Sequence, residues 1–209
     1  PALSPEVWEA TESEYTWESL RGRECVAALD LGSTTDLTSL TLEFMPTQKD
    51  PYSRLWPFFW LPEEQIDIRT EKDRVPYRTW LDHGYLKSTP GSAVSRLFVA
   101  QFLAGLMDQV VIKGCAYDAW RIEDFNTMAK DEGLRLPQMI AFGQGFKSMA
   151  PAVDAFEEKF ISRRLRHPGH PILSMCAANC VYDTSPAGDR KPNKAKATGR
   201  IDGLVTTVM

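Results

Sequence analysis

Two apolar runs near the start of the chain predict a β-hairpin. The first, residues 25–31, is rich in small and branched side chains without strict alternation, which is typical of a central strand covered on both faces. The second covers residues 37–44, and turn-forming residues stand between the two runs: Gly32, Ser33, Thr34 and Asp36. We therefore expect Asp30 to lie at the end of a strand and out of solvent.

A third strand is predicted at residues 54–61, although Pro57 places it toward a sheet edge because proline cannot donate a ladder hydrogen bond. Its four aromatic residues form an apolar cluster without interleaved charge, so we interpret them as core and not as a platform for stacking bases. Ser92 is expected to cap a helix that runs to about Gln109, with Phe98 on its inward face.

The second half of the chain alternates predicted strands and helices. A strand ending at Asp118, a helix stopping at Gly133 and a strand at 136–142 imply parallel neighbours. A helix is expected to open at Ser148, and residues 171–182 read as a further strand.

The expected fold is therefore α/β: a mixed sheet with a leading antiparallel hairpin, later parallel strands and helices on both faces. We expect residues 1–24 to be an acidic, partly helical lead-in from a preceding domain and residues 25–209 to be the domain itself. The chain begins without methionine and stops inside an apolar segment, so we expect it to be part of a longer polypeptide.

Composition narrows the class of protein. With 209 residues, 43% of them hydrophobic, the chain can bury a core as one domain. No apolar run approaches the roughly 18 residues of a membrane helix, and no signal segment opens the chain. The formal net charge of −4 means that a nucleic-acid partner must be held by a local basic patch. The cysteines fit buried free thiols in a reducing compartment better than a zinc site.

Three aspartates stand at the ends of apolar segments: Asp30, Asp118 and Asp202. Each alone fits a turn or a helix cap, but together they predict a carboxylate cluster. Converging carboxylates raise one another's pKa unless a cation neutralises them. Oxygen-only ligands suit Mg²⁺ or Mn²⁺, and two such ions can hydrolyse a phosphodiester without a nucleophilic side chain. Asp36 is interpreted as a turn residue in preference to an auxiliary ligand.

A polar loop with basic residues spans residues 183–196 and leads directly to Asp202. Beside a metal site on an acidic protein, these cations are well placed to contact phosphates. The candidates for DNA binding are Lys191, Lys194, Lys196 and Arg200.

An ordered set of motifs resembles the C-terminal nuclease domain of the large terminase subunit of tailed bacteriophages. The set comprises the run LDLGSTTDLTSL at 29–40, Tyr117-Asp118, the stretch from Arg166 through Asn179, the lysine loop and Ile201-Asp202-Gly203. This resemblance implies a ribonuclease-H-like fold and a two-metal endonuclease that cuts concatemeric viral DNA during packaging. It also implies that Asp30, Asp118 and Asp202 are the catalytic metal ligands.

The resemblance further implies partners and a location. These are double-stranded DNA, an ATPase domain of the same full-length protein, the portal and the small terminase subunit, in the cytoplasm of an infected bacterium. The chain has no GxxxxGK[ST] phosphate loop, so we expect no ATPase activity in it. Because it has no apolar run long enough for a membrane helix, we also expect no membrane partner. Two alternatives stay open: another ribonuclease-H-like nuclease, such as a resolvase, and a catalytically inactive assembly module.

Overall fold

A computed structural model of the chain describes residues 2–32, 36–118 and 122–209. In these parts, seven strands form one mixed sheet with the order β4-β3-β2-β1-β5-β6 and β7 beside β3, and a separate pair, β8 and β9, forms a small second sheet. The strands are β1 (Glu24–Asp30), β2 (Thr38–Phe44), β3 (Ser53–Pro62), β4 (Lys87–Thr89), β5 (Val111–Asp118), β6 (Met139–Phe142), β7 (Leu165–Arg166), β8 (Tyr182–Thr184) and β9 (Arg190–Pro192).

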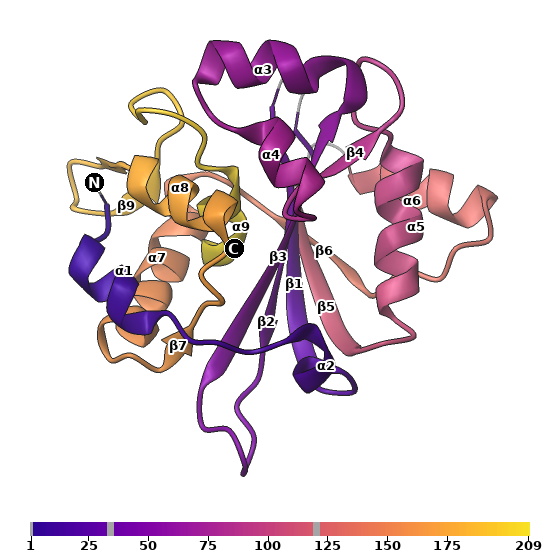
Figure 1. The fold of residues 1–209 in the computed structure, drawn as a ribbon. Helices are drawn as coiled ribbons and strands as arrows, with labels where there is room; N and C mark the ends of the chain where they lie inside the picture. The colour runs from indigo at the N-terminus through magenta and orange to yellow at the C-terminus, as the bar shows by residue number, and fades with distance from the viewer. Residues whose placement is uncertain (1, 33–35, 119–121) are drawn as a thin grey trace.

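Helices cover both faces of the large sheet, as predicted. The helices are α1 (Pro5–Thr11), α2 (Trp17–Leu20), the 3₁₀ turn η1 (Glu63–Gln65), α3 (Ile66–Asp73), α4 (Tyr77–Asp82), α5 (Arg96–Leu106), α6 (Ile122–Asp131), α7 (Phe146–Ile161), α8 (Pro171–Asn179) and α9 (Asp202–Val208). In Figure 1, α5 and α6 lie on one side of the strands, and α7, α8 and α9 lie on the other. None of the helices in the described parts of the chain is long and apolar enough to cross a membrane.

The leading hairpin and the parallel neighbour are both confirmed. Strand β1 pairs antiparallel with β2 from Cys25 opposite Phe44 to Asp30 opposite Ser39. It also pairs in parallel with β5, which in turn pairs in parallel with β6. The predicted turn residues Ser33 and Thr34 lie outside the described residues.

Alternation along the hairpin assigns each residue to one face of the sheet. Leu29, Leu40 and Leu42 are fully buried in the core beneath α5. Ser39 and Thr41 point the other way and bond to α9. The sheet therefore has one apolar face and one face with polar groups among its core residues.

Strand β3 is an inner strand at both ends and an edge in the middle. Strand β4 pairs with Trp60–Pro62, and β7 pairs with Ser53 and Arg54. Between them, in the described structure, Pro57 has a strand partner only on the β2 side, as is typical of proline in a sheet. Phe59 and Trp60 are buried, which agrees with the interpretation of the aromatic cluster as part of the core.

The prediction of a strand at 171–182 is wrong, because residues 171–179 form α8. Pro171 stands at the first helical position, where its fixed φ suits a helix. Burial in α8 recurs with the three-to-four-residue spacing of a helix, at Ile172, Leu173, Cys176 and Ala177. The apolar run at 171–179 therefore follows the helical repeat and not the two-residue repeat of a strand.

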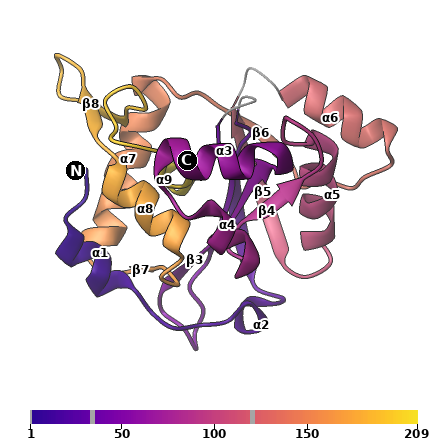
Figure 2. The ribbon, with the colours of Figure 1, turned by 45° about the horizontal axis from the view of Figure 1, so that its top comes forward.

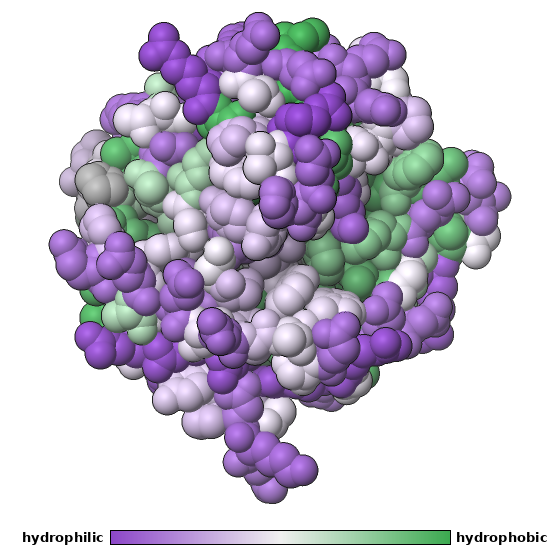
Figure 3. All heavy atoms as spheres, viewed as in Figure 1, coloured by the Kyte–Doolittle hydropathy of each residue, from purple (hydrophilic) through white to green (hydrophobic). Residues whose placement is uncertain are grey.

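The helix predicted from Ser92 to Gln109 is shorter at both ends. Ser95 is its N-cap, accepting a hydrogen bond of 3.3 Å from the N–H of Phe98, and the helix ends at Leu106. Its inward face carries Val99 and Leu103, whereas Phe98 is 48% exposed. Figure 3 shows the resulting apolar area over α5 at the right of the molecule.

Two smaller expectations also change. Helix α7 starts at Phe146, before the predicted Ser148, which puts Pro151 beyond its first turn. The expected loop at 183–196 contains most of an antiparallel pair, β8 with β9, in which Asp183 lies opposite Lys191.

Candidate active site

Asp30 and Asp118 end the neighbouring parallel strands β1 and β5. The residues before them, Leu29 and Tyr117, pair with each other and are buried in the core beneath α5 and α6. Because successive side chains alternate between faces, Asp30 and Asp118 both turn toward the face that carries α9. Two of the predicted aspartates therefore lie side by side on one face.

A cavity of about 190 Å³ opens between these strand ends. Its lining includes Asp30, Asp36, Asp118, Gln144 and Lys194. Gly32 makes the adjoining turn possible, because a Cβ there would lie 2.5 Å from the carbonyl oxygen of Asp36. Asp36 is thus a site residue as well as a turn residue.

Asp202 reaches the same region from α9, of which it is the first residue. Its side chain is almost completely buried. One turn later, the Thr206 hydroxyl lies 2.8 Å from both the Ser39 and Thr41 hydroxyls of β2. These bonds fix α9 against the sheet. Figure 2 shows α9 and α6 on opposite sides of β5 and β6.

Lys194 joins two of the three aspartates. Its Nζ atom lies 3.0 Å from Asp30 Oδ2 and 2.7 Å from Asp202 Oδ1. The two carboxylate side chains are 8% and 3% exposed, whereas the lysine side chain is 45% exposed. A cation therefore stands between two buried carboxylates, and it reaches them from the surface.

Burial and neighbouring charges shift the pKa values of Asp202 and Lys194. Burial raises the pKa of the Asp202 carboxyl, Asp30 and Asp36 act in the same direction, and Lys194 opposes them. Burial by itself favours the neutral amine of Lys194, but Asp202 and Asp30 raise the pKa of that amine above its usual value. The aspartates thus need a positive partner, which Lys194 supplies here.

Arg200 holds the outer side of the site. Its Nη1 donates to Asp36 Oδ1 at 2.6 Å, and its Nε donates to Asp73 Oδ2 at 3.2 Å. The guanidinium therefore ties the segment before α9 to α3 and to the turn after β1. Its role in contacting DNA stays a prediction.

The other predicted DNA-binding residues lie on or next to the β8–β9 hairpin. Lys191 Nζ is 4.9 Å from the ring centroid of Phe146, and Lys196 Nζ is 2.7 Å from Asp183 Oδ1. Both lysines lie on the same segment of the chain as Lys194. Their contact with phosphates also stays a prediction.

Gln144 is a site residue that the sequence analysis did not identify. It follows the third parallel strand, β6, by two residues, as a polar residue beyond an apolar strand end. Its Nε2 atom is buried and has no hydrogen-bond partner among the described residues. The signal that could have found it is the one that found Asp118: a polar side chain just past a parallel strand.

The donor chemistry suits a hard divalent cation, because the aspartates offer only oxygen ligands. The position between Asp30 and Asp202 already holds a positive charge. Within residues 2–32, 36–118 and 122–209, however, no three His, Cys, Asp or Glu side chains are grouped as a ready metal site. The predicted ligands are therefore neighbours, with Lys194 between two of them.

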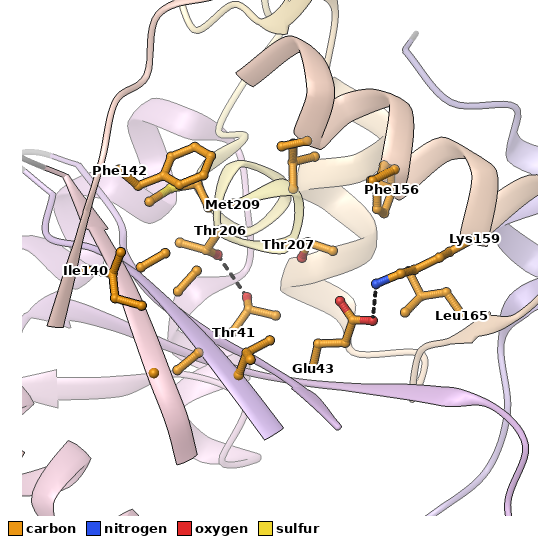
Figure 4. A pocket seen from close by; sticks show the side chains of 18 of the residues that line it. Thr41, Glu43, Ile140, Phe142, Phe156, Lys159, Leu165, Thr206, Thr207 and Met209 are labelled. Carbon is orange, nitrogen blue, oxygen red and sulfur yellow. Dashed lines mark hydrogen bonds and ion pairs between the residues drawn. The ribbon is translucent and has the colours of Figure 1, made fainter. Parts of the chain in front are cut away.

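A larger cavity of about 480 Å³ lies on the same face of the sheet, next to the end of α9. Figure 4 shows Thr206 bonded to Thr41, and Lys159 paired with Glu43 at the other side of this cavity. Its lining is mostly apolar and contains none of the three aspartates. We therefore place the chemistry at the strand ends and not here.

Comparison with known proteins gives this site its context. Residues 2–209 match the family model of the terminase large subunit, endonuclease domain. The large terminase subunit of Enterobacteria phage HK97 is 41% identical over 209 residues, which cover all of this chain and 40% of that protein. Protein YmfN of Escherichia coli is 26% identical over 97% of this chain and 46% of its own length. The chain thus spans less than half the length of either relative.

Solved structures of terminases also match this chain. The crystal structure of the HK97 large terminase matches with a TM-score of 0.92 at 40% identity, over all of this chain and 42% of that one. The large terminase nuclease of thermophilic phage G20c matches with a TM-score of 0.56 at 8% identity, over 94% and 83% of the two chains. The latter likeness concerns the fold alone, which is the ribonuclease-H-like fold expected from the sequence. The chain belongs to the family of endonuclease domains of large terminase subunits.

Proposed function

We propose that this domain is a metal-dependent endonuclease that cuts concatemeric viral DNA during genome packaging. Asp30, Asp118 and Asp202 would hold two divalent ions, Mg²⁺ or Mn²⁺, and would be its catalytic residues. The observation that carries the proposal is the meeting of buried Asp30 and Asp202 around a cation, with Asp118 at the adjacent strand end.

The chemistry of the proposed site divides between the ions and the protein. When bound, the ions would lower the pKa of the attacking water and stabilise the leaving oxygen. Asp30 shares Lys194 with Asp202 and ends the strand beside that of Asp118, so it would be the ligand best placed to serve both ions. The buried α9 would keep Asp202 in place. Lys191, Lys194, Lys196 and Arg200 would contact the DNA phosphates and orient the strand.

Metals in related proteins support this choice of cofactor. Structures of the G20c terminase nuclease have been solved with bound magnesium and with bound cobalt, at TM-scores of 0.54 and 0.55 to this chain. A manganese-soaked nuclease domain of the human cytomegalovirus terminase matches with a TM-score of 0.50. All three are at most 10% identical to this chain, so they support a divalent ion and leave its ligands to be tested here.

The proposed partners follow from the family. Because the chain corresponds to 40% of the HK97 large subunit, we propose that the rest of the full-length protein includes an ATPase domain. Double-stranded DNA, the portal and the small terminase subunit are the remaining proposed partners, in the cytoplasm of the infected host. The isolated domain should therefore cut slowly and without sequence preference, and the attached motor should raise cleavage through effective concentration.

A plasmid-nicking assay tests the proposal. Supercoiled plasmid should be nicked with millimolar Mn²⁺ and left intact with excess chelator. Asp82→Asn, at an exposed position on α4, serves as the control and should cut like the parent. Absence of nicking under all metal conditions would favour an inactive assembly module. Selective cutting of branched DNA over linear DNA would favour a resolvase-like enzyme.

A further inference from the structure

We infer that Lys194 is the built-in counter-ion of the metal site and competes with the divalent ion for Asp30 and Asp202. This inference rests on the proposed function, since it concerns the same aspartates. In the metal-free protein, the ammonium group would hold the place that a divalent cation takes between the two carboxylates. Metal binding would then require the lysine to leave.

The geometry supports an exchange of one cation for another. The Nζ atom contacts one oxygen of each carboxylate, at 3.0 Å and 2.7 Å, which is the bridging position of a shared cation. The lysine and a divalent ion are therefore alternatives at one place.

The lysine is also placed to leave without disturbing the core. Its side chain is 45% exposed and comes from a turn after β9, in the segment that leads to α9. The carboxylates are held by β1 and by the buried α9 and stay where they are. Rotation of a flexible four-carbon stem would free the site.

Charge explains why such a residue is useful. Two buried carboxylates without a cation between them repel each other, which would weaken both the fold and the site. A tethered ammonium offsets this cost until a metal arrives. Because only molecules whose lysine has left can bind metal, the apparent affinity falls by the fraction of open molecules.

Neighbouring cations do not share this role. Lys196 pairs with Asp183, and Arg200 pairs with Asp36 and Asp73. Lys159 offers a matched comparison away from the site, because its Nζ atom also lies 2.7 Å from a carboxylate, that of Glu43, and its side chain is 38% exposed.

Calorimetric titration of Mn²⁺ into the parent, Lys194→Met and Lys159→Met tests the inference. Removing the competing ammonium should tighten Mn²⁺ binding about tenfold, on the scale expected for two partly exposed ion pairs. Without metal, the Lys194→Met protein should also have a lower Tm than the parent. Mn²⁺ should raise the Tm of Lys194→Met by more than it raises that of the parent. Lys159→Met should bind Mn²⁺ like the parent. Equal or weaker binding by Lys194→Met would overturn the inference.

A second measurement on the unaltered protein does not depend on the variant folding. Acetylation of lysine amines, followed by mass spectrometry, should modify Lys194 faster with Mn²⁺ than without it, because displacement frees the amine. Lys159 is the internal reference and should react at the same rate in both conditions. An unchanged Lys194 rate at saturating Mn²⁺ would also overturn the inference.

The two proposals fail in different ways. Equal Mn²⁺ affinities with intact metal-dependent nicking would remove only the role of Lys194. No Mn²⁺ binding and no nicking by the parent would remove the proposed nuclease function, and the inference with it.

Discussion

The two faces of the central sheet use the same strands for different purposes. On one face, Leu29 and Leu40 pack with α5 and Tyr117 packs with α6, in a core of leucine, valine and aromatic side chains. On the other, Asp30 pairs with Lys194, which also pairs with Asp202 of the buried α9, and Asp118 lines the same cavity. Alternation along a strand lets adjacent residues serve stability and chemistry separately. Variants on the two faces should therefore fail in different ways.

The largest effect is expected on the polar face. Asp30→Asn should reduce metal-dependent nicking at least about 10³-fold, because it removes a ligand shared by both proposed ions. Circular dichroism should show a native fold. Asp118→Asn and Asp202→Asn should behave alike, and a double variant should lose little more, since the site acts as a unit. Nicking by Asp30→Asn at the parent rate would remove the assignment of the three aspartates.

The apolar face should show the reverse. Leu103 on α5 is fully buried beneath the sheet, so Leu103→Ala should lower the free energy of unfolding by about 2–5 kcal/mol through the cavity it leaves. Urea unfolding measures this change. The Mn²⁺ affinity of the folded variant should equal that of the parent. A large loss of Mn²⁺ affinity would mean that the two faces are not separable.

Metal should stabilise the polar face of the intact protein. A ligand that binds only the folded state at a hundred times its Kd adds about 2.7 kcal/mol. Thermal unfolding with and without Mn²⁺ should therefore show a raised Tm for the parent and for Leu103→Ala. The rise should disappear in Asp118→Asn, and an equal rise in that variant would place the ion elsewhere.

A smaller effect is expected where the polar face meets α9. Thr206→Val removes the hydroxyl that bonds to Ser39 and Thr41, which should cost about 1–2 kcal/mol of stability and weaken Mn²⁺ binding several-fold. Thr207→Val is the matched control, because the Thr207 hydroxyl donates to the Gly203 carbonyl of its own helix, 2.7 Å away. Equal Mn²⁺ affinities for the two variants would show that Thr206 does not position Asp202.

The smallest effect concerns the surface beside the polar face. Lys191→Met and Lys196→Met together should reduce the dependence of DNA affinity on salt by about one to two units of log–log slope, one for each lost phosphate contact. Binding to a labelled duplex at several salt concentrations measures the slope. Lys159→Met is the control, and an unchanged slope in the double variant would leave the β8–β9 segment outside the DNA interface.

Much of this arrangement could be predicted because it depends on local patterns. Asp30 and Asp118 were found from apolar runs that end in an acid, and strand–helix–strand order made their strands parallel. The sequence does not identify α8 as a helix, because a short apolar run is compatible with both the repeat of a helix and the repeat of a strand. The bond from Lys194 to Asp30 joins residues 164 positions apart, and no local signal in the β8–β9 segment specifies which acid its lysines meet.

The buried position of α9 also sets the order in which the site can be completed. Its anchor to the sheet joins Thr206 to Ser39 across 167 residues, so this contact closes one of the longest loops in the chain. A ribosome that has not yet released residues 202–208 has made two of the three aspartates but not the helix that carries the third. The proposed metal site can therefore form only after residues 202–208 have been synthesised and have packed against the sheet.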